Sequence, residues 1–294
     1  MKRAAILVVI LALGTLASAQ YQTPPAQSGG TQPGPAATPP PPQVGKRPPQ
    51  AKTQAEFDAY KVVAANTDPA AMEKATDDFA TKFPDSELRI LLYRNVMHSY
   101  QTANKAEQMM EMGRKVLKID PDDPEALVGV AQVLAERTRD TDLDKDQRLD
   151  EGMKLAQHAV ETTDTDITVP PGTPQEKIDE YKGFLRSNAY YVLGTIQYTR
   201  EKYSDAEGYF HKSLDAYPSQ PDPLAVLRLA LSLDKQEKYP EALKFANQAV
   251  QMTDSSQGST LSTLARNERD RLVQLTGGTP AKPPASAQNP APKN

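Results

Sequence analysis

The sequence predicts an all-α protein, an α-solenoid of about five stacked helix pairs with one more helix closing its C-terminal end. Three observations predict this fold. Apolar residues recur at spacings of three and four, as one buried face of a helix requires. Helix-start signals, in which an acceptor side chain precedes proline, occur at intervals along the chain. Similar helix pairs also return with a period of about 34 residues, which is typical of a stacked array.

The first nineteen residues have the layout of a secretory signal peptide. Lys2 and Arg3 give a positive start, Ala4–Leu16 is uncharged and mostly apolar, and Ala17 to Ala19 supply the small residues of a cleavage site. We therefore predict cleavage after Ala19 and a periplasmic or secreted protein. The apolar run is shorter than the roughly 20 residues that span a bilayer. An uncleaved leader that tethers the chain to a membrane is the alternative, and it is the one case in which we expect membrane contact.

Two proline-rich segments flank the centre of the chain. Residues 1–52 and 277–294 together hold 15 of the 26 prolines and none of the 38 acidic residues. Such segments cannot bury enough apolar surface to offset the loss of chain entropy. We therefore predict a disordered linker over residues 20–52, a disordered tail over 277–294, and one solenoid over 53–276.

Charge and cysteine content exclude several classes of function. The central segment 53–276 carries all 38 acids against 27 lysines and arginines, a net charge of −11, whereas nucleic-acid binding needs a basic face. The absence of cysteine excludes disulfides, thiol catalysis, thiolate metal sites and a lipidated cysteine anchor.

Helices are predicted in order along the central segment. Four apolar faces mark the first helix of successive pairs: Tyr93, Val96, Met97 and Tyr100; Leu127, Val130, Ala131 and Leu134; Tyr190, Leu193 and Gly194; Val226, Leu229, Ala230 and Leu233. Four dipeptides predict helix starts: Asp68-Pro69, Asp123-Pro124, Thr173-Pro174 and Asp222-Pro223. No stretch shows the strict alternation of a half-buried strand.

Small residues recur at fixed depths in the paired helices. The clearest copies are Tyr190, Gly194, Tyr203, Ala206, Phe210 and Pro218, followed by Tyr239, Ala242, Ala246 and Ala249. This pattern resembles the tetratricopeptide repeat. The resemblance covers roughly 54–275 as five helix pairs, with Leu261–Leu275 similar to a capping helix and with insertions at 139–150 and 162–185.

The resemblance implies a concave groove lined by the first helix of each pair. By register, the groove residues are Arg94, His98, Gln101, Val128, Gln132, Tyr191, Thr195, Tyr198, Leu227 and Leu231. Val128, Tyr191 and Leu227 stand where a clamp for a terminal carboxylate would have lysine. The resemblance therefore implies a peptide or protein segment with aromatic or aliphatic anchors. Packing of Leu227 and Leu231 against the capping helix is the alternative for those two residues.

The first insertion contains a pattern of acidic residues. Asp140, Asp142, Asp144 and Glu151 match ligand positions one, three, five and twelve of a helix–loop–helix calcium loop. Lys145 occupies the sixth position, where the sharp turn requires glycine. A solvated acidic loop is therefore the interpretation that we favour over a calcium site.

Catalytic motifs are missing. His98, His158 and His211 fall on separate predicted helices, and the sequence has no metalloprotease, nucleophile-elbow or phosphate-loop motif. We predict a non-catalytic protein–protein interaction scaffold exported to the periplasm or cell envelope, with a protein or peptide partner, no cofactor, no nucleic acid and no small-molecule ligand. A component of envelope assembly or cell-division coordination is one alternative, because Phe79–Ser86 resembles a joint in such proteins. A calcium-modulated binding protein is the other.

Overall fold

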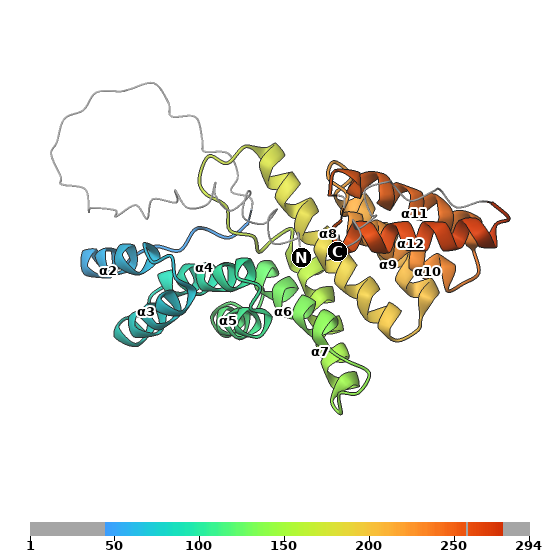
Figure 1. Cartoon of the computed structure of the whole chain (residues 1–294). Coiled ribbons are helices and arrows are strands. Elements are labelled where there is room, and N and C mark those ends of the chain that lie inside the picture. The colour runs from blue at the N-terminus through green and yellow to red at the C-terminus, as the bar shows by residue number, and fades with distance from the viewer. Residues whose placement is uncertain (1–44, 257, 279–294) are drawn as a thin grey trace, which may run out of the picture. The chain divides into compact units, whose positions relative to one another are not determined.

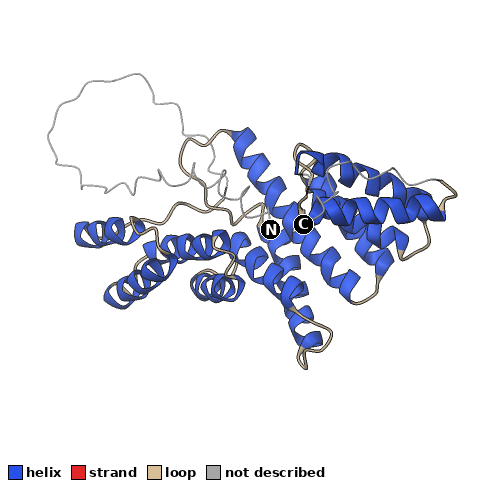
Figure 2. Ribbon diagram, viewed as in Figure 1, coloured by secondary structure: helices blue, strands red, loops and turns tan. Residues whose placement is uncertain are grey.

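The computed structural model describes residues 45–256 and 258–278. Regular structure in these residues is helical (Figure 2), apart from one isolated β-bridge between Lys46 and Thr168. The predicted leader, linker residues 20–44 and tail residues 279–294 lie outside the described residues. The described residues divide into two compact units between Val192 and Leu193, within the long helix that follows the second insertion, and each unit is described by itself.

The N-terminal unit consists of successive helices in which each packs against the next as far as α7 (Figure 1). These helices are α2 (Gln54–Ala64), α3 (Pro69–Lys82), α4 (Leu88–Thr102), α5 (Ala106–Ile119), α6 (Pro124–Arg137), α7 (Lys145–Thr162) and the first part of α8 (Gln175–Thr199). α2 also contacts α4, so the first helices of the first two pairs pack together.

The C-terminal unit begins with the last part of α8, from Leu193. Its other helices are α9 (Tyr203–Ala216), α10 (Pro223–Asp234), α11 (Tyr239–Thr253) and α12 (Thr260–Leu275). α12 packs against both α10 and α11, as a capping helix does. The predicted succession of five helix pairs and one capping helix is confirmed.

Three of the four predicted helix starts are capped as the sequence indicates. The carboxylates of Asp68, Asp123 and Asp222 accept hydrogen bonds from backbone N–H groups one or two residues inside their helices, at 2.8–2.9 Å. These bonds satisfy donors that have no partner within the helix. The fourth helix, α8, begins at Gln175, directly after Thr173-Pro174.

Small residues lie where neighbouring helices cross, as predicted. A Cβ atom on Gly194 would lie 2.7 Å from the ring of Phe210, which is fully buried. A Cβ atom on Gly113 would lie 2.7 Å from Val130 Cγ2. Glycine at these positions lets the helices approach closely enough for the large side chains to fill the space between them.

The last residues of the predicted linker contact the N-terminal unit. Residues 45–52 are described and lie along the N-terminal unit, where Lys46 pairs with Asp120 and Arg47 pairs with Glu87. Prolines 48 and 49 hold this stretch extended, while its two basic residues find acidic partners. Composition alone did not reveal this pairing, because the partners lie 40 and 74 residues away in the sequence.

Candidate functional site

A shallow groove lies in the N-terminal unit between the first helices of three successive pairs. It holds about 340 Å³ of empty space, part of it open to solvent. Its apolar lining consists of Met97, Met109, Val128, Gly129, Phe184 and Leu185. Its polar lining consists of His98, Gln101, Glu125, Gln132 and Asn188.

Helix register places the groove residues. His98 and Gln101 lie three apart on α4, and Val128 and Gln132 lie four apart on α6, so each pair shares one helical face. Gly129 leaves room for the side chain of Met109 at the bottom of the groove, because a Cβ atom on Gly129 would lie 3.1 Å from Met109 Cε. The two thioether side chains on the floor are flexible, and such side chains adapt to ligands of irregular shape.

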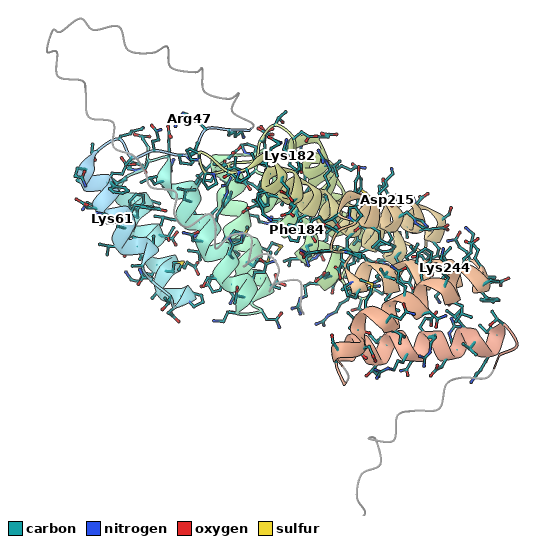
Figure 3. The ribbon with its side chains drawn as sticks, turned by 90° about the horizontal axis from the view of Figure 1, so that it is seen from above. Arg47, Lys61, Lys182, Phe184, Asp215 and Lys244 are labelled. Atoms are coloured by element: carbon teal, nitrogen blue, oxygen red, sulfur yellow. The ribbon has the colours of Figure 1, made fainter. Side chains whose placement is uncertain are left out.

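The second insertion supplies one wall of the groove. Phe184, labelled in Figure 3, and Leu185 belong to the inserted part of α8 and are both buried. Leu185 packs with Ile167 and Ile178 in a small apolar cluster inside the insertion. The insertion therefore builds part of the candidate site.

An ionisable pair lies at one end of the groove. His98 Nε2 lies 3.3 Å from Glu125 Oε2, and both side chains are largely buried. The hydroxyl of Tyr181, on α8, donates to the other oxygen of Glu125. Burial by itself would raise the pKa of Glu125, but contact with His98 and the nearby charge of Arg94 outweigh it and hold that pKa below its ordinary value. Glu125 therefore presents an ionised carboxylate, which can accept hydrogen bonds but cannot donate them.

Arg94 belongs to a buried ion pair and does not line the groove. Its Nε donates to Asp123 Oδ2 at 2.6 Å, and the side chain of Asp123 is 0% exposed. Asp123 also accepts the backbone N–H of Ala126 at the start of α6. We predicted Arg94 as a groove residue, but the structure assigns it to the joint between two helix pairs.

The structure brings together four of the predicted groove residues, His98, Gln101, Val128 and Gln132. Sequence reasoning missed Met97, Met109, Glu125, Gly129, Phe184, Leu185 and Asn188. The sequence could have indicated Glu125 as a groove residue, because it lies three residues from Val128 on the same face of one helix. It could not have indicated Phe184 and Leu185, because they lie in an insertion that the repeat register does not cover.

The other predicted groove residues lie elsewhere. Tyr191 and Thr195 are buried, with 1% and 3% of their surface exposed, so our prediction that they line a groove is wrong. Tyr198 is half-buried, with Tyr203 edge-on to its ring at 5.3 Å and the Arg228 guanidinium 5.5 Å from the ring centre. A Tyr198 held in this way is a packing residue of the C-terminal unit.

Leu227 and Leu231 pack where our alternative placed them. Leu227 is buried in a cluster with Val226, Ala249 and Ala265, and Leu231 packs against that cluster. Ala265 lies on α12, so these leucines hold the capping helix. Their assignment to the groove is therefore wrong.

The acidic pattern of the first insertion does not form a calcium loop. α7 begins at Lys145, so the second half of the expected loop is helical and Glu151 pairs with Arg114. Asp140 pairs with Lys145 at 2.8 Å. No group of three or more histidines, cysteines or acids placed to hold a metal ion occurs in the described part of the chain.

Comparison with solved structures establishes the fold. No protein-family model and no curated protein matches the sequence. PilF of Pseudomonas aeruginosa aligns with a TM-score of 0.51 and 17% identity, over 76% of this chain and 87% of PilF. The chain has the fold of the tetratricopeptide-repeat proteins.

Two further structures with tetratricopeptide repeats align less closely. The MamA protein matches at 13% identity and a TM-score of 0.47, over 70% of this chain and 95% of its own. PilW, described as a widely conserved type IV pilus biogenesis factor, matches at 16% identity and a TM-score of 0.37, over 72% of this chain and 98% of its own. Among the described helices, none combines the length and apolar character needed to cross a bilayer.

Proposed function

We propose that the protein is an exported, non-catalytic protein–protein interaction scaffold that binds an extended peptide or protein segment in the groove of its N-terminal unit. One observation carries this proposal. Three side-chain amides, Gln101, Gln132 and Asn188, come from three successive first helices and surround a single apolar floor.

The amides suit an extended backbone. Each side-chain amide offers donors and an acceptor, as a peptide backbone requires of its partner. The amides of Gln101 and Asn188 make no hydrogen bond to any other described residue, and Gln132 Nε2 donates to Glu136 at 3.0 Å, which leaves its carbonyl oxygen for a ligand. The floor below them accepts an apolar side chain of the bound segment.

The openness of the groove favours a peptide over a small molecule. Sites for small molecules are concave and bury most of the ligand. The groove here is shallow and partly open to solvent. A segment that lies across the helices can use the whole row of amides, whereas a small ligand reaches only one or two of them.

Removing the three amides together is expected to weaken peptide binding. Each lost hydrogen bond costs about 0.5–1.5 kcal/mol, so the variant Gln101→Ala/Gln132→Ala/Asn188→Ala should bind at least about tenfold more weakly. We suggest selecting random peptides of roughly ten residues on the wild-type protein and measuring the affinity of the selected peptides by calorimetry. The selected peptides should share an apolar residue.

A matched control removes three exposed amides from second helices. Gln108 lies on α5, and Gln147 and Gln157 lie on α7, away from the groove lining. The variant Gln108→Ala/Gln147→Ala/Gln157→Ala should bind the selected peptides as the wild type does. Equal affinity of the groove variant and the control variant would show that the groove is not the binding site.

Export is proposed from the leader pattern of Lys2, Arg3, the apolar run and Ala17–Ala19. Sequencing the N-terminus of the protein recovered from the periplasm or medium should find Gln20 as its first residue. A chain that begins at Met1 and sediments with the membrane would instead support the tethered alternative.

The resemblance of Phe79–Ser86 to a joint of envelope-assembly proteins has a structural explanation. Phe79 is buried with its ring 5.0 Å from that of Phe83, and the Ser86 hydroxyl donates to buried Glu56. These residues join α3 to α4, a task that any array of this kind requires. They therefore do not favour a role in envelope assembly over other scaffold roles.

A further inference from the structure

Residues Gly45 to Arg47 form a strap across the N-terminal unit, which we call the clasp. The Lys46 N–H donates to the Ile167 carbonyl oxygen at 2.9 Å. Lys46 Nζ lies 2.7 Å from Asp120 Oδ1 and 2.8 Å from Asp166 Oδ1, so it pairs with two separate loops. Arg47, labelled in Figure 3, donates from both terminal nitrogens to the carboxylate of Glu87 at 2.6 and 2.7 Å.

Gly45 is required by the way the clasp docks. Its φ of +90° lies in the region that favours glycine. A Cβ atom at this position would also overlap the carbonyl oxygen of Ile167. Any side chain at position 45 therefore both strains the backbone and pushes the clasp away from the insertion.

The clasp connects to the groove wall through one continuous set of contacts. The side chain of Ile167 is 1% exposed and packs with Leu185, with Tyr181 against the same cluster. Leu185 lines the groove, and the Tyr181 hydroxyl donates to Glu125 in the groove. The residue that the clasp holds is thus in contact with the wall that faces the ligand.

We infer that the clasp controls the groove: its docking on Ile167 fixes the wall made by Tyr181, Phe184 and Leu185, and its release loosens that wall. This inference rests on the proposed function of the groove and adds a means of regulating it.

The inference predicts an effect of two substitutions at a distance from the groove. Gly45→Ala prevents docking by its Cβ atom, and Lys46→Met removes both ion pairs but keeps the apolar stem. In the full chain, each variant should speed hydrogen exchange of residues 167–188 by roughly tenfold, the factor expected for the loss of about 1.4 kcal/mol of local stability. Exchange in α10 of the C-terminal unit should stay unchanged and serves as the internal reference.

A second measurement reports the groove directly. The chain contains no cysteine, so spin labels at Gln132→Cys and Asn188→Cys report the distance across the groove by pulsed electron paramagnetic resonance. The distance distribution should broaden in both clasp variants. Salt at about 1 M, where the Debye length is about 3 Å, should broaden it in the wild type and add little in Lys46→Met.

Lys74→Met is the matched control, because Lys74 also pairs with an aspartate, Asp78, at 2.8 Å, but on the exposed face of α3. It should leave exchange and label distance unchanged. Wild-type exchange and wild-type distances in both clasp variants would overturn the inference. Since neither measurement uses a ligand, that failure is distinct from a failure of the groove to bind peptides.

Discussion

Replacing Phe210 with alanine is expected to lower the free energy of unfolding of the C-terminal unit by about 4 kcal/mol. The side chain is 0% exposed and fills the space over Gly194, where paired helices α8 and α9 cross. Its removal forfeits the apolar burial and leaves a cavity that backbone on both sides keeps from closing. Urea denaturation followed by circular dichroism should show the loss as a lower midpoint, and a repeat array transmits it to neighbouring pairs.

The glycine opposite Phe210 provides the controls for this prediction. Gly194→Ala places a methyl group 2.7 Å from the ring and should destabilise, although alanine is the better helix former. Gly208→Ala, on α9 with nothing within 4 Å of the new methyl group, should stabilise by about 1 kcal/mol. In a Phe210→Leu background, Gly194→Ala should cost less than it does alone. Equal stabilisation by Gly194→Ala and Gly208→Ala would contradict the assigned contact.

Replacing Arg94 with methionine should cost about 3–5 kcal/mol at neutral pH. The substitution leaves the carboxylate of Asp123 buried without its counter-charge, in a place where its side chain is 0% exposed. Burial already raises the pKa of Asp123, and the charge of Arg94 opposes that rise. Without Arg94 the folded-state pKa rises further above the unfolded value.

The pH dependence of the Arg94→Met penalty gives the prediction a specific sign. A carboxyl group whose pKa is raised by folding binds a proton in the folded state, so stability increases as the pH falls through the raised pKa. The difference in unfolding free energy between wild type and the variant should therefore be largest near about pH 7 and become smaller towards about pH 4. Denaturation midpoints of both proteins at each pH provide the comparison.

A double variant tests the cause of the Arg94→Met penalty. Asparagine remains a good N-cap residue, so Arg94→Met/Asp123→Asn removes the charge but keeps the bond to the Ala126 N–H. This variant should recover much of the stability and lose the added pH dependence. If Arg94→Met lowered the unfolding free energy equally at neutral and at acidic pH, Asp123 would have gained water or another partner, and our explanation of the penalty would be wrong.

The helices and their pairing could be predicted because their signals are local. Asp123 next to Pro124 starts a helix through a hydrogen bond to Ala126, a contact within three residues of sequence. Ala242, Ala246 and Ala249 are all fully buried at the spacing the sequence shows, since a helix face is set by its own 3.6-residue period. The register of the repeat that the chain resembles, and not periodicity alone, pointed to His98, Gln101, Val128 and Gln132, which all line the groove.

The failures at Tyr191 and Leu227 have a common physical cause. A first helix in a stacked array is contacted by its own partner and by the next pair, so more than one of its faces can be buried. Periodicity states that two residues share a face, but it does not state whether solvent or a neighbouring helix covers that face. Leu227 is covered by α12, a helix that begins more than 30 residues later in the sequence.

The sequence by itself determined the fold class, the succession of helix pairs, the capping helix and the helix faces. The signals for these features are apolar periodicity, N-cap residues and small residues at fixed spacings, and each can be recognised within one or two helical turns. The tertiary structure alone decided that Phe184 and Leu185 form a groove wall, that Arg94 is matched with Asp123, and that Lys46 holds the insertion through Asp120 and Asp166. These contacts join residues 29 to 120 positions apart, and their geometry depends on how whole helices stack. The conformational preferences of neighbouring residues in the sequence do not determine contacts over such separations.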